Sequence, residues 1–370
     1  MLRQAKRFLN YFLWLAAAKT SGELPVNIRY NTLEVGQVET KSEPLVNEDK
    51  RMLKYNDLLT LDRKKLMSND FCVLRKNSTL AKARAFLGVL QKSGYIIITD
   101  SSDKFLGVLT DISILHEFPP NEKYIPYSYQ IDDKKTHKEV INSIDNAADQ
   151  TIEDAFILEA NYRKYYRDGA IIDILQELEK PYGYYAQTKV VPLLNTDNSI
   201  AGVISYREIL EFIKEKQVID NITAKEAFSE KDLADNLCTL SPENTLASAY
   251  FLIKYLPTEY ILVCDKQDNE PILHGWLDKR KISPMVHPLY RHLRNMPVNQ
   301  IMDSVNSLYL IEPNEPINKV INFFLKRGNK ISANVVVVVK NKTASELQPL
   351  GILTPINILQ FFIKFLINQA

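Results

Sequence analysis

Glycine is scarce in this sequence, with 11 of 370 residues, or about 3% against a usual share of about 7%. Neither the G-x-G-x-x-G pattern nor a Walker-type phosphate loop occurs, which argues against two large classes of nucleotide-dependent enzyme. No stretch reaches 18 uninterrupted apolar residues, so the sequence predicts no membrane-spanning helix. Cys72, Cys238 and Cys264 are odd in number and lack C-x-x-C spacing, which indicates neither a disulfide framework nor a zinc site.

Neither sign of charge dominates the sequence. The 46 Lys and Arg residues against 45 Asp and Glu residues give a net charge of +1. A dedicated nucleic-acid binder needs a basic surplus to neutralise phosphates, so we expect no nucleic-acid partner. The chain is 45% hydrophobic, which together with its length predicts two or three globular domains with a large core.

The sequence of residues 1–57 predicts an N-terminal helix followed by an irregular leader. Basic residues and no acid precede an apolar stretch over residues 8–18, and the polar sequence that follows lacks sustained periodicity. This start also resembles a secretory signal peptide. Asn10, Tyr11 and Trp14 argue against export, so we favour a helix packed on the protein. A helix that docks on a membrane surface or on a partner is the next alternative.

A pattern centred on glycine occurs four times and organises the rest of the chain. Each glycine is followed by two apolar residues, then a small polar or acidic residue, and then a helical stretch. The four positions are Gly107, Gly202, Gly275 and Gly351. Because self-similarity at intervals of this size is typical of repeat architectures, we take each glycine as the marker of one copy.

The sequence before each glycine repeats as well. An apolar run rich in β-branched residues predicts a buried strand at 95–99, 190–194, 260–263 and 335–339. Helical stretches precede these strands at 80–90, 171–178, 247–256 and 317–325, and amphipathic helices follow the glycine at 205–214 and 354–366. The predicted fold class is therefore α+β, with four tandem helix-strand-strand-helix units. Because one such unit is too small to bury its apolar face, we expect the units to pair into two modules.

The predicted boundaries divide the chain after the leader as follows. Repeat 1 covers 58–118, an insertion 119–150, repeat 2 151–215, a polar linker 216–231, repeat 3 232–285 and repeat 4 286–370.

The repeated unit resembles the CBS domain, and the pairs look like Bateman modules. The resemblance is strongest at residues 190–213 and 298–361, where Ile301 and Met302 match the usual opening of the family. The resemblance implies cytosolic regulatory modules that bind adenine nucleotides in the cleft between paired units. AMP, ADP, ATP and S-adenosylmethionine are the ligands to be expected, with no certain cofactor.

The ligand signature of the family can be compared with each copy. In its nucleotide-binding members, Thr or Ser three residues after the glycine contacts phosphate, and an Asp three residues later binds the ribose. The first position holds Thr110, Ser205, Asp278 and Thr354, and the second holds Ser113, Glu208, Lys281 and Asn357. Copy 2 is therefore the best candidate, with Ser205, Glu208 and an apolar lining from Val191 and Pro192. Thr110 and Thr354 are weaker candidates, and Asp278 would repel a phosphate.

The same residues have a second interpretation that needs no ligand. Ser or Thr at the start of a helix is more often an N-cap than a phosphate ligand, and Thr110, Ser205 and Thr354 each precede a helical stretch. Glu208 then becomes a residue on a solvated helix face.

No catalytic motif accompanies the repeats. The five histidines form no H-E-x-x-H pattern, and the nucleophile pattern G-x-S-x-G is absent. Outside the repeats only the first sixty or so residues remain, which is too little for most catalytic domains. We therefore expect no enzyme activity, no catalytic residue and no metal ligand.

Two functions remain after these exclusions. The first is a cytoplasmic regulatory protein that senses an adenine nucleotide or a related ligand. The second is a scaffold or oligomerisation protein with degenerate pockets, which docks a partner protein or a membrane surface through its N-terminal helix. A homodimer or a partner protein is expected in either case, and a regulatory subunit of an enzyme on another chain is a more distant third function.

Overall fold

The computed structural model describes most of the repeated part of the chain. The described residues are 53–89, 94–110, 113–114, 142, 146, 149–156, 163–180, 188–235, 237–255, 259–267, 270–282, 293–326 and 334–369. They lie in the larger of two units, Lys50–Ala370, the other being Met1–Asp49. The predicted N-terminal helix, nearly all of the leader and most of the 119–150 insertion therefore lie outside the described residues.

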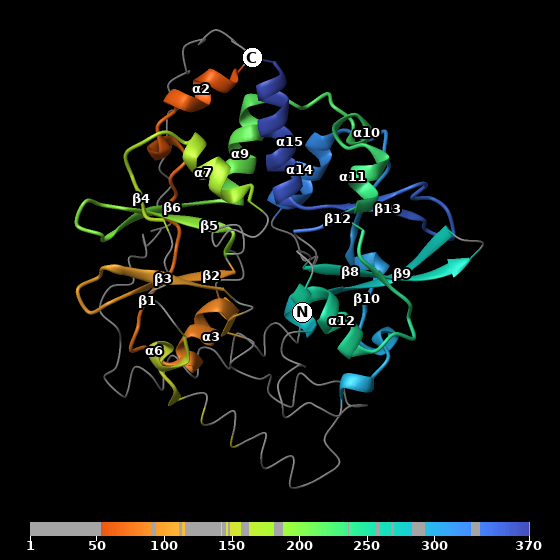
Figure 1. The fold of residues 1–370 in the computed structure, drawn as a ribbon, viewed down its shortest axis with the longest axis horizontal. Coiled ribbons are helices and arrows are strands. Elements are labelled where there is room, and N and C mark those ends of the chain that lie inside the picture. The colour runs from red at the N-terminus through yellow and green to blue at the C-terminus, as the bar shows by residue number, and fades with distance from the viewer. Residues whose placement is uncertain are drawn as a thin grey trace, which may run out of the picture. The chain divides into compact units, whose positions relative to one another are not determined.

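Four short sheets form the framework of the described residues, one in each copy (Figure 1). Copy 1 has β1 (Val73–Arg75), β2 (Tyr95–Thr99) and β3 (Phe105–Thr110), and copy 2 has β4 (Tyr165–Tyr166), β5 (Val190–Leu194) and β6 (Ile200–Ser205). Copy 3 has β7 (Thr239–Leu240), β8 (Tyr260–Gln267) and β9 (Glu270–Asp278), which β10 (Asp303–Ser304) extends. Copy 4 has β11 (Tyr309–Ile311), β12 (Val336–Val339) and β13 (Pro349–Leu353).

The helices alternate with these strands along the chain. The longer ones are α3 (Leu80–Val89), α7 (Ile172–Leu178), α9 (Tyr206–Lys216), α12 (Leu246–Tyr255), α14 (Ile317–Leu325) and α15 (Pro355–Asn368). The shorter ones are α2 (Tyr55–Thr60), η1 (Arg63–Lys65), α6 (Ile152–Ala155), α10 (Ala224–Ala227), α11 (Glu230–Asp235), α13 (Lys279–Ile282), η6 (Val298–Gln300) and η7 (Val305–Ser307).

Three of these sheets have one strand more than the sequence predicts, and the sheet of copy 3 has two, β7 and β10. The two longer strands pair antiparallel, as the alternation of apolar runs and polar turns predicts. A strand of two or three residues lies parallel to the first of them in every copy. Such a strand is too short to show a period in the sequence, which is why the pattern analysis missed it.

The repeated glycines occupy one register position in all four sheets. They pair with Ile98, Leu193, Val263 and Val338, and the register shifts directly after each of these residues. A Cβ atom on Gly202 would lie 2.3 Å from Cγ of Met67, and one on Gly351 would lie 2.5 Å from the carbonyl oxygen of Leu233. Glycine is required at Gly202, Gly275 and Gly351 because another part of the chain crosses the strand there.

The chain that crosses the strand comes from the start of a partner copy. We call η1, α6, α10 and η6 the opening turns of copies 1 to 4. Isolated β-bridges join each opening turn to the start of the first helix of its partner, namely Asp62–Ala170, Thr79–Thr151, Thr223–Pro316 and Thr245–Pro297. These exchanges pair copy 1 with copy 2 (the first module) and copy 3 with copy 4 (the second module). The opening turn α10 falls in the range predicted as a linker, so the exact domain boundaries stay a prediction.

Five apolar cores among the described residues hold the copies together, and two of them bury an opening turn, η6 or α6, in the partner copy. In the first module one sheet face of each copy packs against the other, with Ile97 of copy 1 and Val203 of copy 2 buried between them. Trp276 of copy 3 and Val337 of copy 4 are buried in the same way in the second module. A third core lies among α7, α9, α14 and α15, and it joins copy 2 to copy 4.

Candidate ligand site

Ser205 and Glu208 meet at the start of α9. The backbone N–H of Ser205 donates to Oε2 of Glu208 at 2.8 Å, and the Ser205 hydroxyl donates to the same oxygen. Ser205 Oγ accepts from the backbone N–H of Arg207 at 3.2 Å. These bonds form a capping box, the arrangement in which the residues at Ncap and N3 satisfy each other's backbone donors. Both side chains are partly exposed, so the pair stands where a ligand can reach it.

The equivalent residues of the other copies also cap helices. Thr354 donates its backbone N–H and its hydroxyl to Oδ1 of Asn357, at 2.9 and 2.7 Å. Thr110 Oγ1 lies 3.0 Å from Oγ of Ser113 and accepts from the backbone N–H of Ser113 at 3.2 Å. In copy 3 the carboxylate of buried Asp278 accepts from the N–H of Lys281 at 2.8 Å. The geometry therefore shows the capping role at all four positions, while ligand binding stays a prediction.

Val191 and Pro192 lie next to this helix start but face different parts of the molecule. Both are buried in the middle of β5. Val191 belongs to the core that α7 and α9 cover. Because side chains alternate along a strand, Pro192 shares the opposite face with Val190, which packs against copy 1. Of the two predicted lining residues, only Pro192 is on the face toward copy 1.

Tyr95 of copy 1 is a neighbour of this site that the sequence did not indicate. Burial raises the pKa of its hydroxyl, and the negative charges of Glu208 and Asp70 raise it further. Tyr95 also pairs with Thr110 across β2 and β3. The buried Tyr95 is therefore joined to the cap residue of its own copy by strand pairing and is close enough to Glu208 of copy 2 to respond to its charge. The sequence pattern marked Tyr95 only as the first residue of a predicted strand, so it gave no sign of a functional role.

A cation lies beside the start of α9. Lys189 immediately precedes β5, whose first residue Val190 pairs with Ser205. Its backbone is left-handed, with φ of 62°, and its Nζ forms an ion pair with the carboxylate of Glu259 in copy 3. Burial raises the pKa of the neighbouring Tyr206 hydroxyl, with Lys189 opposing the shift and Glu259 adding to it. The ion pair is thus close to the first turn of α9.

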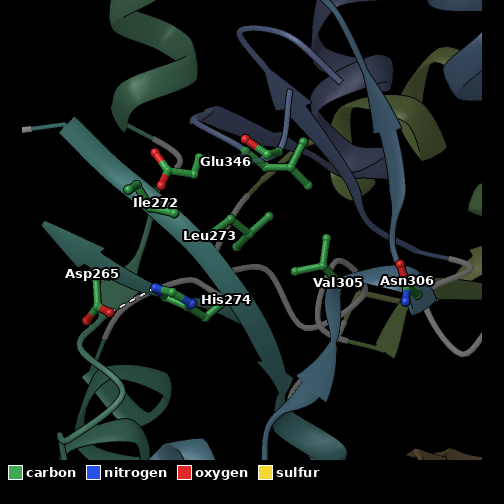
Figure 2. A pocket seen from close by; sticks show the side chains of 9 residues that line it. Asp265, Ile272, Leu273, His274, Val305, Asn306 and Glu346 are labelled. Carbon is green, nitrogen blue, oxygen red and sulfur yellow. Dashed lines mark ion pairs between the residues drawn. The ribbon is translucent and has the colours of Figure 1, made fainter. Parts of the chain in front are cut away.

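A cavity of about 370 Å³ lies elsewhere, in the second module (Figure 2). Leu273 and His274 of β9, Val305 of η7 and the 345–347 segment of copy 4 line it. His274 Nε2 is 2.8 Å from Oδ2 of Asp265 at its edge. The cavity is at the opposite end of β9 from the cap Asp278, and none of the predicted ligand residues line it.

The described residues show no second kind of chemical centre. Burial raises the pKa of the Cys72 and Cys264 thiols to about 12, which makes both poor nucleophiles. No group of three His, Cys, Asp or Glu side chains that could hold a metal is found among them. Of the helices in this part of the chain, none has both the length and the apolar character to cross a bilayer.

Comparison with solved structures identifies the fold. Protein MJ1225 of Methanocaldococcus jannaschii, described as a candidate archaeal homologue of g-AMPK, matches with a TM-score of 0.58 and 14% identity over 82% of this chain and 100% of that one. A CBS domain-containing protein of Bacillus anthracis matches 40% of this chain and 98% of its own, with 19% identity and a TM-score of 0.30. CBSX2, solved in complex with AMP, matches 42% of this chain and 96% of its own, with 12% identity and a TM-score of 0.30. The chain has the CBS-domain fold.

The CBS fold accounts for the arrangement of the four copies. The predicted α+β units and their pairing into two modules are confirmed, with the short parallel strand as the addition. No family model matches the sequence, and neither does any curated protein. The CBS likeness therefore rests on the structure, and at this identity it shows the fold alone.

Proposed function

We propose that this chain is a non-catalytic, cytoplasmic regulatory protein that binds an adenine nucleotide at the start of α9 in copy 2. The observation that carries the proposal is the meeting of a hydroxyl and a carboxylate at one helix start, those of Ser205 and Glu208. CBSX2 was solved with AMP, and MJ1225 is described as a candidate homologue of g-AMPK, which gives the choice of ligand its context.

Each of these groups matches one part of a nucleotide. The first N–H groups of α9, an 11-residue helix, point out of its N-terminus, where the helix dipole favours a phosphate. The hydroxyl of Ser205 donates to such an anion once it turns from Glu208. The Glu208 carboxylate, which only accepts, suits the two ribose hydroxyls.

The other copies lack this combination. Copies 1 and 4 have a hydroxyl at the cap but no carboxylate three residues later, as Ser113 and Asn357 stand there. Copy 3 has the buried acid Asp278 at the cap, and a phosphate at that position would be repelled. We therefore assign one nucleotide site, in copy 2.

Calorimetry and thermal unfolding with AMP, ADP, ATP and S-adenosylmethionine test the proposal. A saturable heat and a rise in melting temperature with one of them support it, because a ligand that binds only the folded state stabilises that state. Two variants keep the cap while changing the site. Ser205→Asp preserves an N-cap but adds a negative charge, and Glu208→Gln preserves the capping box. Both should bind at least tenfold more weakly, and Thr354→Ser in copy 4 should bind as the wild type does.

Two results would contradict this function. One is the absence of any heat or thermal shift with all four compounds at millimolar concentration. The other is an unchanged dissociation constant in both Ser205→Asp and Glu208→Gln, which would move the site elsewhere.

A scaffold with degenerate pockets is the second candidate. It is favoured by one observation, namely that each of the four caps is satisfied by a residue of its own helix. A homodimer or a complex with a partner protein is then the functional form. Analytical ultracentrifugation distinguishes the two functions, since a scaffold assembles without nucleotide and its assembly does not change when nucleotide is added.

A further inference from the structure

Lys189 and Glu259 occupy the same position in two different copies. Each is the residue immediately before the first long strand, β5 or β8. The next residue of each, Val190 or Tyr260, pairs with the helix cap at the end of the following strand, Ser205 or Asp278. Both also lie four residues before the strand partner of the repeated glycine. By that register the corresponding residues are Gly94 in copy 1 and Asn334 in copy 4, so only copies 2 and 3 have a charge here.

The two charges meet although they belong to different modules. Nζ of Lys189 and Oε2 of Glu259 form an ion pair in which the side chains are 34% and 26% exposed. Such a pair is partly shielded from solvent, so it is stronger than a fully exposed one but still open to exchange. It is a polar connection between copy 2 and copy 3, in addition to the apolar core that joins copies 2 and 4.

Copy 3 has an acid at the cap position where copy 2 has Ser205. The buried carboxylate of Asp278 caps α13, and the backbone carbonyl of Glu259 accepts from the N–H of Lys279, the first residue of that helix, at 2.8 Å. Glu259 therefore stands beside the start of α13, and its carboxylate pairs with a cation in the neighbouring copy.

We propose that Lys189 contacts the phosphate of the copy 2 ligand, and that Glu259 of copy 3 competes with that phosphate for the lysine. This inference rests on the proposed nucleotide site. Binding then replaces an ion pair between modules by one between protein and ligand. The ligand thereby changes what holds copy 2 to copy 3, and only an anionic ligand does so.

The competition predicts opposite effects for the two partners. Lys189→Gln removes the cation and should lower the affinity for AMP at least tenfold, because a charge-assisted bond to phosphate is lost. Glu259→Gln removes the competing carboxylate and should raise the affinity for AMP about threefold to fivefold. A partly exposed ion pair contributes about this much. The double variant should resemble Lys189→Gln, because Glu259 acts only through the lysine.

Calorimetric titration of the full chain with AMP, ADP and ATP, each against adenosine, tests this inference. Adenosine lacks phosphate, so its affinity should be the same in all variants. Lys189→Arg should stay within a few-fold of the wild type because it keeps the charge. Lys180→Gln is the matched control, since the exposed Lys180 side chain forms an ion pair with Glu177 in the same copy. Thermal unfolding of each variant verifies that it is folded.

The outcomes separate this inference from the proposed function. If the wild type binds a nucleotide and both single variants bind it equally well, Lys189 is not a ligand residue and the inference fails while the function stands. A weaker affinity in Glu259→Gln also overturns the inference, because Glu259 then supports the site instead of competing. If neither the wild type nor Glu259→Gln binds any nucleotide, the proposed function fails and the inference fails with it.

Discussion

Glu208 accepts hydrogen bonds from both the backbone N–H and the hydroxyl of Ser205, and both bonds end on the same carboxylate oxygen. A phosphate that takes the Ser205 hydroxyl must therefore compete with Glu208 for it. The cap and the ligand site share their atoms, so a substitution that removes the cap also changes the site. Variants at these positions are informative only when the stability of the helix is measured together with binding.

The first prediction concerns this shared cap. Glu208→Ala should lower the free energy of unfolding by about 1 kcal/mol, because the N-cap backbone N–H loses its acceptor. Glu208→Gln should cost less than half of this, since its amide oxygen can accept the same bond. Urea unfolding of the two variants measures the difference. Equal losses in both would show that the charge of Glu208, and not the cap geometry, stabilises α9.

The sequence predicted the framework of the fold because its signals are local. Apolar runs placed β2 and β5 at their observed bounds, and the periodicity of residues 317–325 placed α14. The glycine spacing identified the four copies. The exchange of opening turns is different, because bridges such as Asp62–Ala170 join residues about a hundred positions apart. No local pattern contains that information.

The candidate site divides in the same way. Ser205 and Glu208 are three residues apart on one helix, so their meeting follows from helix geometry alone. Tyr95 and Glu259 belong to other copies, and their place beside copy 2 depends on how the copies pack. Lys189 was adjacent to a predicted strand, but its left-handed backbone and its partner become visible only in three dimensions.

The second prediction concerns the close approach at the repeated glycines. Gly351→Ala should destabilise the second module by about 3 kcal/mol, because its Cβ would lie 2.5 Å from a backbone oxygen of Leu233. Gly202→Ala should cost less, since its closest neighbour is the flexible Met67 side chain, although Ser68 O is at 2.9 Å. Thermal unfolding of both single variants and of the double variant Gly202→Ala, Met67→Ala tests this order of stability losses. Failure of the Met67 change to recover part of the loss would assign the clash to the Ser68 backbone.

The third prediction concerns Arg63, a buried cation that joins the opening turn of copy 1 to copy 2. Its Nε donates to the carbonyl oxygen of Ala170 at 2.9 Å, and its Nη1 donates to the carbonyl oxygen of Tyr166 at 2.9 Å. Its Nη2 forms an ion pair with Asp173. Arg63→Met should lower the free energy of unfolding by about 3 kcal/mol, because Asp173 and the carbonyls lose their donor.

Two variants provide the comparison for Arg63. Arg63→Lys keeps the charge but not the planar fork, so it should recover only part of the loss. Lys64→Met should change stability very little, since the Lys64–Asp168 pair is exposed on both sides. Complete recovery in Arg63→Lys would mean that charge alone, and not the set of hydrogen bonds, holds this junction.

The last prediction concerns the acid sensitivity of the second module. Burial alone would raise the pKa of Glu315, but hydrogen bonds from Lys319, Lys342 and the backbone N–H of Glu312 outweigh it and lower the pKa to about 2. A carboxyl group with a lowered pKa in the folded state adds stability above its ordinary value near 4.5, and this stability is lost as the pH falls toward 2. Glu315→Gln should therefore be less stable than the wild type at pH 7, and the difference should shrink steadily below pH 4.5. Urea unfolding of both proteins from pH 7 to pH 3 measures it, and a difference that does not change with pH would show that Glu315 acts through packing and not through its charge.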